Sequence, residues 1–186
     1  RRDAARATRP TMKLLLAFAR GIDWISDRFA SVAAWAVLAS CFISAGNALV
    51  RYGLHTSSNA WLEIQWYLFA ACVMLGAAQV LRMNEHVRVD VVYGRFASRV
   101  RVWIDLLGLL GFLLPVMGLM LWLSWPLFTK MLASGEMSGN VGGLIRWPAM
   151  LMLPLGFALL TLQGLAEIIK RIAWLLHLYD MDLHYE

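Results

Sequence analysis

Long apolar stretches separated by short polar segments dominate the pattern of this chain. A helix rises 1.5 Å per residue, so about 20 apolar residues cross a hydrocarbon core of about 30 Å. Four stretches reach that length: residues 29–50, 61–81, 102–128 and 147–169. The third is longer than needed and contains Pro115, so we expect a kink or a tilt there. Only helices and closed barrels satisfy their backbone hydrogen bonds in lipid, so these unbroken runs predict an all-α membrane protein with four transmembrane helices.

The polar segments beside the spans carry a periodic pattern of their own. In residues 11–28, apolar side chains recur three and four positions apart, and charged ones occupy much of the opposite side. We expect an amphipathic helix that lies in the plane of the membrane surface or packs on a partner. Residues 85–101 predict a second in-plane helix, with a short extended start near residues 86–91 as an alternative. Residues 1–186 then form a single four-span domain that ends in a cytoplasmic tail, residues 170–186.

Composition and charge support the membrane assignment and predict its orientation. Hydrophobic residues make up 60% of the chain, against about 45–50% in soluble domains. The net charge of +5 is compatible with binding to nucleic acid or to an anionic membrane surface. The distribution of charge favours the membrane, because fourteen of the 17 Lys and Arg residues flank the spans on one side. The positive-inside rule places that side, with both termini and the second connection, in the cytoplasm. Trp24 and Trp174 lie near the inner membrane boundary, as in an aromatic belt.

Ionisable residues occupy the ends of the spans and leave the span centres nearly free of charge. At the end of the fourth span, Glu167 precedes Lys170 and Arg171 by three and four residues. At the start of the third span, Asp105 lies one turn after Arg101. Residues three or four apart are neighbours on a helix, so we predict a local ion pair at each site. Span centres without charge indicate a protein with no carrying chemistry of its own, because polar groups at membrane depth are costly.

Glu63 is a carboxylate that this pattern does not explain. It lies near the outer end of the second span in an apolar and aromatic context, with Gln65 two residues later. Three interpretations are open. The side chain faces water at the span end, contacts a second subunit, or relays protons.

The remaining small and polar residues indicate packing rather than catalysis. In the first span, small residues recur at four-residue spacing through Ser40 and Ser44, with Asn47 beside them, and such stripes let helices approach closely. The four His residues fall outside the span interiors, which disfavours a buried haem, and the two cysteines are expected to be free, buried thiols. No cofactor, metal or catalytic residue is predicted. The glycine-rich connection of residues 130–147 is either a flexible loop or a docking surface.

Short motifs are distributed over about residues 20–170. They are Glu63 early in the second span, Leu75-Gly76 later in it, the segment His86-Val87-Arg88-Val89-Asp90-Val91, Glu136-Met137-Ser138 in the second outer loop, and Pro154-Leu155-Gly156-Phe157 in the fourth span. The segment that begins at His86 is the most specific. With four spans and cytoplasmic ends, the chain resembles the small membrane (Q) subunit of the tripartite ATP-independent periplasmic (TRAP) transporters.

This resemblance implies sodium-coupled uptake of organic anions, such as carboxylates or sugar acids, across a bacterial inner membrane. A periplasmic substrate-binding protein delivers substrate to a large membrane subunit that moves as an elevator. The small subunit forms a heterodimer with the large one and braces it as a non-catalytic scaffold. Its partners are these two proteins and membrane lipids, without nucleic acid. The candidate partner-contact or structural residues are Ser40, Ser44, Asn47, Glu63, Gln65, His86, Arg88, Asp90, Glu136 and Ser138.

Two other classes of function compete with this scaffold role. One is a self-sufficient, small proton-coupled exporter that uses Glu63 as its proton site. The other is a membrane enzyme or redox subunit, which the placement of potential ligands disfavours.

Overall fold

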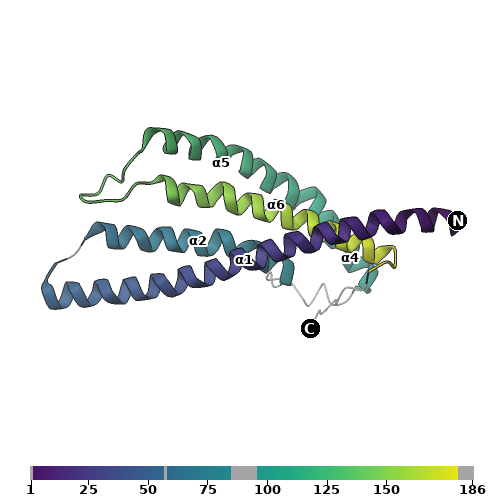
Figure 1. Cartoon of the computed structure of the whole chain (residues 1–186), viewed down its shortest axis with the longest axis horizontal. Helices are drawn as coiled ribbons and strands as arrows, with labels where there is room; N and C mark the ends of the chain where they lie inside the picture. Colours follow the sequence, from purple (N-terminus) through teal and green to yellow (C-terminus); the bar gives the residue numbers. More distant parts are fainter. Residues whose placement is uncertain (1, 57, 85–95, 180–186) are drawn as a thin grey trace.

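The computed structural model describes residues 2–56, 58–84 and 96–179, with side chains described from residue 11 onward. Its helices are α1 (Arg2–Leu54), α2 (Asn59–Met83), α4 (Ser98–Gly108), the π-helical turn η1 (Leu109–Leu113), α5 (Leu114–Ser134) and α6 (Trp147–Leu175). Since α4, η1 and α5 follow one another without a gap, the described residues contain four helices long and apolar enough to cross a membrane. The predicted all-α class with four transmembrane helices is confirmed (Figure 1).

The long helix α1 joins two segments that the sequence pattern separates. The amphipathic segment of residues 11–28 and the first span are both helical, and no break divides them. Their bundle-facing positions recur three and four residues apart, which is the spacing of left-handed helix packing. These buried or half-buried positions are Ala19, Ile22, Ser26, Phe29, Ala33, Ala36, Ser40, Ile43 and Asn47. Because one seam continues through both segments, residues 11–28 and the first span form one continuous helix (Figure 1).

The third span contains an irregular turn directly before Pro115. The combined helix of α4, η1 and α5 covers 37 residues. Proline has no backbone N–H, and its ring displaces the carbonyl four residues earlier, which here belongs to Gly111 inside η1. The widened π-helical turn is thus the local response to Pro115. Most of the second predicted in-plane helix, including its extended start, falls on residues 85–95, outside the described residues.

The four spans are arranged as a layer in the order α5, α6, α2, α1 (Figure 1). The packing contacts agree with this order, because α1 packs on α2, α2 on α6, and α5 principally on α6. At the end where α1 begins and α6 ends, α1 also packs against α6. We call this end the termini end, and the opposite end, with the α1–α2 and α5–α6 connections, the loop end. A layer one helix thick leaves two faces uncovered, so large apolar side chains such as Trp35, Phe69 and Trp122 stay exposed.

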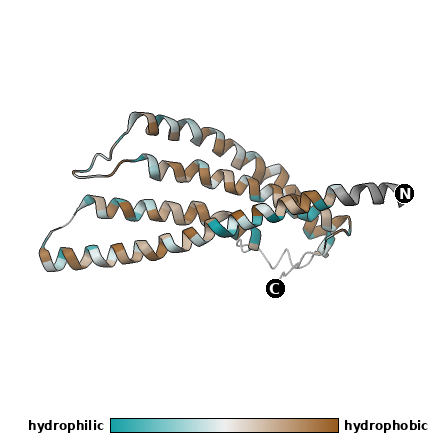
Figure 2. Cartoon of the chain, in the orientation of Figure 1, coloured by the Kyte–Doolittle hydropathy of each residue, from teal (hydrophilic) through white to brown (hydrophobic). Residues whose placement is uncertain are grey.

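The core is made of small patches along the helix seams. One patch joins α1, α2 and α6 through Ala33, Leu75, Ala78 and Leu159. Another joins α2, α4, η1 and α6 through Leu81, Leu106, Leu109 and Ile168. Figure 2 shows hydrophobic residues along all four spans and hydrophilic residues gathered near the termini end of α1. The polar groups there, and a second set at the loop end, make up the candidate site.

Candidate functional site

The termini end holds a buried ionic cluster between α1 and α6. Lys170 donates hydrogen bonds to Asp23 on α1 and to Glu167 on its own helix, both over 2.7 Å. Removing a charged side chain from water costs several kcal/mol of free energy unless the charge is paired and hydrogen-bonded. Here the carboxylates of Asp23 and Glu167 each accept a hydrogen bond from the Lys170 ammonium. The Lys170–Glu167 contact confirms the ion pair predicted from their three-residue spacing.

Arg171 extends this cluster to the third span. Its guanidinium contacts Glu167 over 2.5 Å and Asp105 on α4 over 3.2 Å. The three side chains are only 6%, 6% and 8% exposed, respectively. Since Arg171 is held by carboxylates from α6 and α4, it fixes the start of the third span against the end of the fourth. The pairing of Glu167 with Arg171 was predicted, whereas Arg171 as a partner of Asp105 was not.

Two neutral polar residues complete the cluster inside the helix seam. Ser26 on α1 and Gln163 on α6 are fully buried, and the Ser26 hydroxyl donates to the Gln163 Oε1 over 2.7 Å. The Gln163 amide nitrogen donates to Asp23 over 2.9 Å. We refer to the set Asp23, Ser26, Asp105, Gln163, Glu167, Lys170 and Arg171 as the termini-end cluster. Nearby, Arg82 on α2 forms an ion pair with Asp27 on α1, so all four spans are tied together at this end.

The loop end is held by a different device, in which Glu63 receives hydrogen bonds from the α5–α6 connection. The Ser138 hydroxyl and the Asn140 amide both donate to Glu63 Oε1, the latter over 2.7 Å. The backbone N–H of Leu144 donates to Glu63 Oε2 over 2.7 Å. Glu63 is 3% exposed. We refer to Glu63, Ser138, Asn140 and Leu144 as the loop-end cluster.

Further contacts stabilise the α5–α6 connection, which the loop-end cluster attaches to α2. An isolated antiparallel bridge pairs Met137 with Ile145. Next to it, Glu136 forms an ion pair with Arg146 over 2.6 Å, with both side chains more than 40% exposed. The Tyr67 hydroxyl donates to the Ile145 carbonyl over 3.0 Å. Although rich in glycine, the connection thus has a defined shape and is attached to α2.

The other predicted candidate residues are spread over the chain. Ser40 is half-buried in the seam of α1, whereas Ser44 is exposed. The Gln65 amide donates to the Trp61 carbonyl of its own helix over 3.1 Å. The candidates His86, Arg88 and Asp90 lie outside the described residues. Of the two free cysteines, Cys41 is exposed, so its expected burial is wrong.

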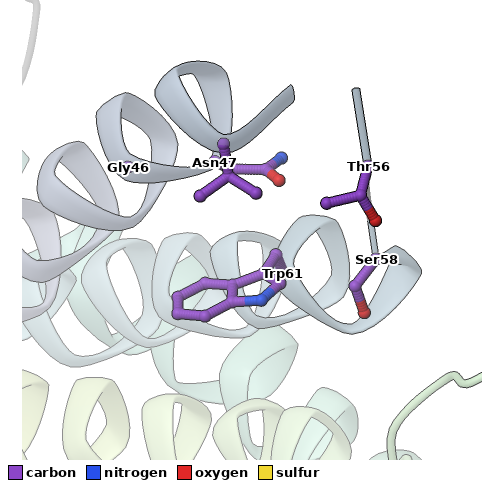
Figure 3. Close-up of a pocket in the computed structure, with 6 residues that line it drawn as sticks. Gly46, Asn47, Thr56, Ser58 and Trp61 are labelled. Atoms are coloured by element: carbon purple, nitrogen blue, oxygen red, sulfur yellow. The ribbon is translucent and has the colours of Figure 1, made fainter. Parts of the chain in front are cut away.

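Asn47 lines a pocket of about 280 Å³ between the loop ends of α1 and α2. Figure 3 shows its amide facing the segment that carries Thr56 and Ser58, with the Trp61 ring on the α2 side. The apolar Val50 and Trp61 and the polar Asn47, Thr56 and Ser58 line the pocket. Asn47 therefore belongs to the loop-end surface and not to a site at the centre of the spans.

Comparison with known families agrees with this architecture. The family described as the DctQ component of the tripartite ATP-independent periplasmic transporters matches residues 40–173. The chain belongs to this family. Comparisons with curated proteins and with solved structures gave no match. As a DctQ component, the chain is the small Q subunit of a TRAP transporter, a multi-pass inner-membrane transport subunit and not an enzyme, so the resemblance seen in its motifs is confirmed.

The sequence pattern missed part of each cluster in this DctQ component. Asp23 reads as one of several charges on an amphipathic helix, and Ser26 carries no signal of its own. Gln163 has a signal that could have been used, since it lies four residues before Glu167 on the same helix face. At the loop end, Asn140 and the Leu144 N–H lie in a glycine-rich stretch that gives no indication of which group they bind.

Proposed function

We propose that this DctQ component is the non-catalytic scaffold of a sodium-coupled, binding-protein-dependent transporter for organic anions such as carboxylates or sugar acids. In this proposal it forms a heterodimer with the large membrane subunit and braces that subunit while it moves as an elevator. One observation carries the proposal: the four spans form a single layer that is tied by polar contacts at both ends and exposes large apolar side chains on its faces. Such a layer is suited to act as a rigid support for the large subunit.

The polar ties support the bracing role because they oppose sliding between helices. At the termini end, a partly buried ion pair connects α1 to α6, and a buried one connects α4 to α6. At the loop end, Glu63 connects α2 to the segment that joins α5 and α6. A helix cannot shift along its neighbour without separating these charged or hydrogen-bonded groups, which is costly where water is excluded. A subunit that resists such shifts provides a fixed reference for a moving neighbour.

The exposed faces give the surfaces on which the partners would bind. Apolar side chains gain little from leaving lipid for another apolar surface, so helix association in membranes relies on close packing. Ser44 is a small, exposed residue on the loop-end half of α1, and Ser40 is half-buried one turn before it. We place contact with the large subunit on this side of α1. The loop end, which carries the Glu136–Arg146 pair and the pocket beside Asn47, would face the periplasmic binding protein.

Reconstitution tests the scaffold function directly. Liposomes would receive the large subunit, the small subunit or both, with the binding protein and an inward sodium gradient, and uptake of a labelled organic acid would be measured. We expect uptake only when both membrane subunits are present. Uptake by the small subunit alone would contradict the proposal, and full uptake by the large subunit alone would show that no brace is needed.

The contacts of Glu63 favour this structural role over a proton-coupled exporter. A proton relay requires a carboxylate that can exchange protons with a pathway, whereas both oxygens of Glu63 accept hydrogen bonds from the same connection. In the reconstituted transporter, Glu63→Gln should therefore reduce assembly and uptake in proportion. Complete loss of uptake with full assembly of the two subunits would contradict this structural role and favour a proton site at Glu63.

Reporter fusions test the proposed orientation, in which the termini end faces the cytoplasm. A reporter that is active only in the cytoplasm should work when inserted near residue 95, in the second connection. The same reporter inserted near Gly139 should be inactive, because that connection would lie in the periplasm. The opposite result would reverse the orientation, and with it the proposed side of the binding protein.

A further inference from the structure

A pocket of about 290 Å³ opens at the termini end between α1 and the residues that follow α6. Three cationic side chains, one phenol hydroxyl and two apolar side chains line it: Lys13, Arg20, Lys170, Tyr179, Leu16 and Ala19. None of these lining residues is acidic. A pocket with this lining is suited to an anionic group attached to an apolar body.

Lys13 and Arg20 bring positive charge that the described residues do not compensate. Within residues 11–56, 58–84 and 96–179, no ion pair joins either side chain to a carboxylate. The two residues are seven positions apart, so they lie two turns apart on the same side of α1. Asp23 and Glu167 are close to the pocket, but Lys170 already contacts both of them. An ammonium has three N–H donors, so Lys170 retains one beyond these two contacts.

Neighbouring residues indicate that the pocket lies at the level of lipid headgroups. Trp24 follows Arg20 by one turn, is 60% exposed and lies beneath the guanidinium of Arg28 at 5.2 Å. Exposed Trp rings of this kind are typical of the membrane–water boundary. On other sides of the same stretch, Leu14 and Phe18 are also exposed, with 73% and 54% of their surface accessible. Apolar side chains next to uncompensated cations are the features of a helix that contacts both acyl chains and anionic headgroups.

We infer that this pocket binds the headgroup phosphate of an anionic phospholipid. Lys13 and Arg20 would pair with the phosphate, and Tyr179 and the third N–H of Lys170 would donate hydrogen bonds to the lipid's oxygens. Leu16 would contact the glycerol and the first acyl carbons. Basic pockets between membrane helices are known to hold anionic headgroups by this combination. A bound lipid would connect the protruding start of α1 to the end of α6, outside the ionic contacts of the termini-end cluster.

Native mass spectrometry of the full chain in mild detergent, titrated with phosphatidylglycerol, tests the inference. The variant Lys13→Gln/Arg20→Gln should bind phosphatidylglycerol at least about tenfold more weakly, because it removes two cations that attract the anionic headgroup. The matched control is Arg51→Gln/Lys130→Gln, which removes the same charge from exposed residues at the loop end. The control should keep its affinity within about twofold. Equal losses in both variants would overturn the inference, because net charge alone would then explain binding.

A second variant guards against a folding defect in the first. Tyr179→Phe removes one hydroxyl without changing charge, and circular dichroism would verify that every variant keeps its helix content. We expect Tyr179→Phe to weaken phosphatidylglycerol binding measurably. In this variant, inorganic phosphate should not compete with the lipid. Unchanged binding in both this variant and the Lys13→Gln/Arg20→Gln variant would overturn the inference.

Competing occupants give distinct results in the same titration. Phosphatidylcholine should bind more weakly than phosphatidylglycerol, and equal binding would overturn the assignment to an anionic lipid. Displacement of the lipid by inorganic phosphate would identify a free anion as the ligand and would likewise overturn it. Replacing the acids of the tail by amides, in Asp180→Asn/Asp182→Asn/Glu186→Gln, should leave binding unchanged. If only this amide variant bound lipid, the chain's own tail would be the occupant and the inference would be wrong.

Discussion

The two ends of this DctQ component are held by opposite means. At the termini end, charged side chains from α1, α4 and α6 pair with one another inside the helix seams, and Arg171, Glu167 and Asp105 are almost fully buried. At the loop end, a single carboxylate, Glu63, collects neutral donors from one connection. The ion pair of that connection, Glu136–Arg146, is exposed. One end therefore ties helices to helices, and the other ties a loop to a helix.

This difference predicts which substitutions unfold the whole chain and which only open the loop. Breaking a buried ion pair leaves a charge without a partner inside the protein, so every helix that the pair joins is affected. Breaking a bond between a loop and a helix frees the loop but leaves the helix contacts in place. We expect substitutions at the termini end to change the unfolding of the whole chain. Substitutions at the loop end should change the local opening of residues 135–146.

The largest expected effect is that of Arg171→Met, which leaves Glu167 and Asp105 without the cation that joins them. Loss of one partner of a buried pair costs about 3–5 kcal/mol. The free energy of unfolding should fall by that order, as measured by denaturant titration of the purified chain in detergent. The matched control, Arg146→Met, removes the exposed pair at the other end and should cost about 0–1 kcal/mol. Similar losses for both variants would remove the distinction between the two ends.

Glu63→Gln should act on the loop rather than on the whole chain. The amide of Gln presents a donor where one of the Glu63 oxygens accepts, so at least one of Ser138, Asn140 and the Leu144 N–H loses its acceptor. Loss of such a contact shifts a local opening equilibrium by about 5- to 30-fold. Limited proteolysis within residues 135–146 should accelerate by that order while the denaturant midpoint changes little.

The control for this prediction is Gln65→Ala, because the Gln65 amide contacts only the Trp61 carbonyl of its own helix in the described structure. Its proteolysis rate should equal that of the unmodified chain. A lower denaturant midpoint for Glu63→Gln, without faster cleavage of the loop, would show that the loop end also ties helices together.

A methyl group added to the loop should test how tightly it is packed. A Cβ at residue 143 would lie 2.6 Å from the Ser138 Cβ and 3.0 Å from the Glu63 Oε1, so Gly143→Ala must displace the loop-end cluster. Overpacking of this kind costs about 1–3 kcal/mol. Hydrogen exchange of residues 135–146 should therefore increase. Gly139→Ala, in the same loop, meets nothing within 4 Å and should leave exchange unchanged. Equal exchange in the two variants would mean that the loop adapts freely.

The spans and the local ion pairs could be predicted from the sequence because each depends only on residues that are close together in the chain. Span length follows from hydrocarbon thickness, and the pairing of Glu167 with Lys170 and Arg171 follows from the helix repeat. The continuity of α1 through residue 28 was not predicted, for a related reason. Charge composition distinguishes an amphipathic segment from a span, but it does not end a helix in which no proline or cap interrupts the hydrogen bonds.

The contacts that define the clusters join residues far apart in the chain, and no periodic pattern encodes them. Asp23 and Lys170 are 147 positions apart, and Glu63 and Asn140 are 77 apart. For Glu63 the sequence left three interpretations open, since its environment depends on where the connection folds. The family motifs did mark both Glu63 and Ser138, and the structure brings these two into contact. The two family motifs that contain them were thus a better guide than the hydropathy around either residue.

The smallest effect is expected for Ser26→Ala, which tests whether the neutral part of the termini-end cluster matters beside its charges. The variant removes the hydroxyl that donates to the buried Gln163 Oε1 over 2.7 Å. A typical intramolecular hydrogen bond contributes about 0.5–1.5 kcal/mol, so the free energy of unfolding should fall by about 1 kcal/mol. In a thermal scan this is a shift of about 2–4 °C for a chain of this size. Ser31→Ala, which removes an exposed hydroxyl bonded to the Asp27 carbonyl on the same helix, should shift the midpoint by less than about 1 °C. If Ser26→Ala changed the midpoint as little as Ser31→Ala, the ion pairs alone would hold the termini end, and Gln163 would serve only to position Asp23.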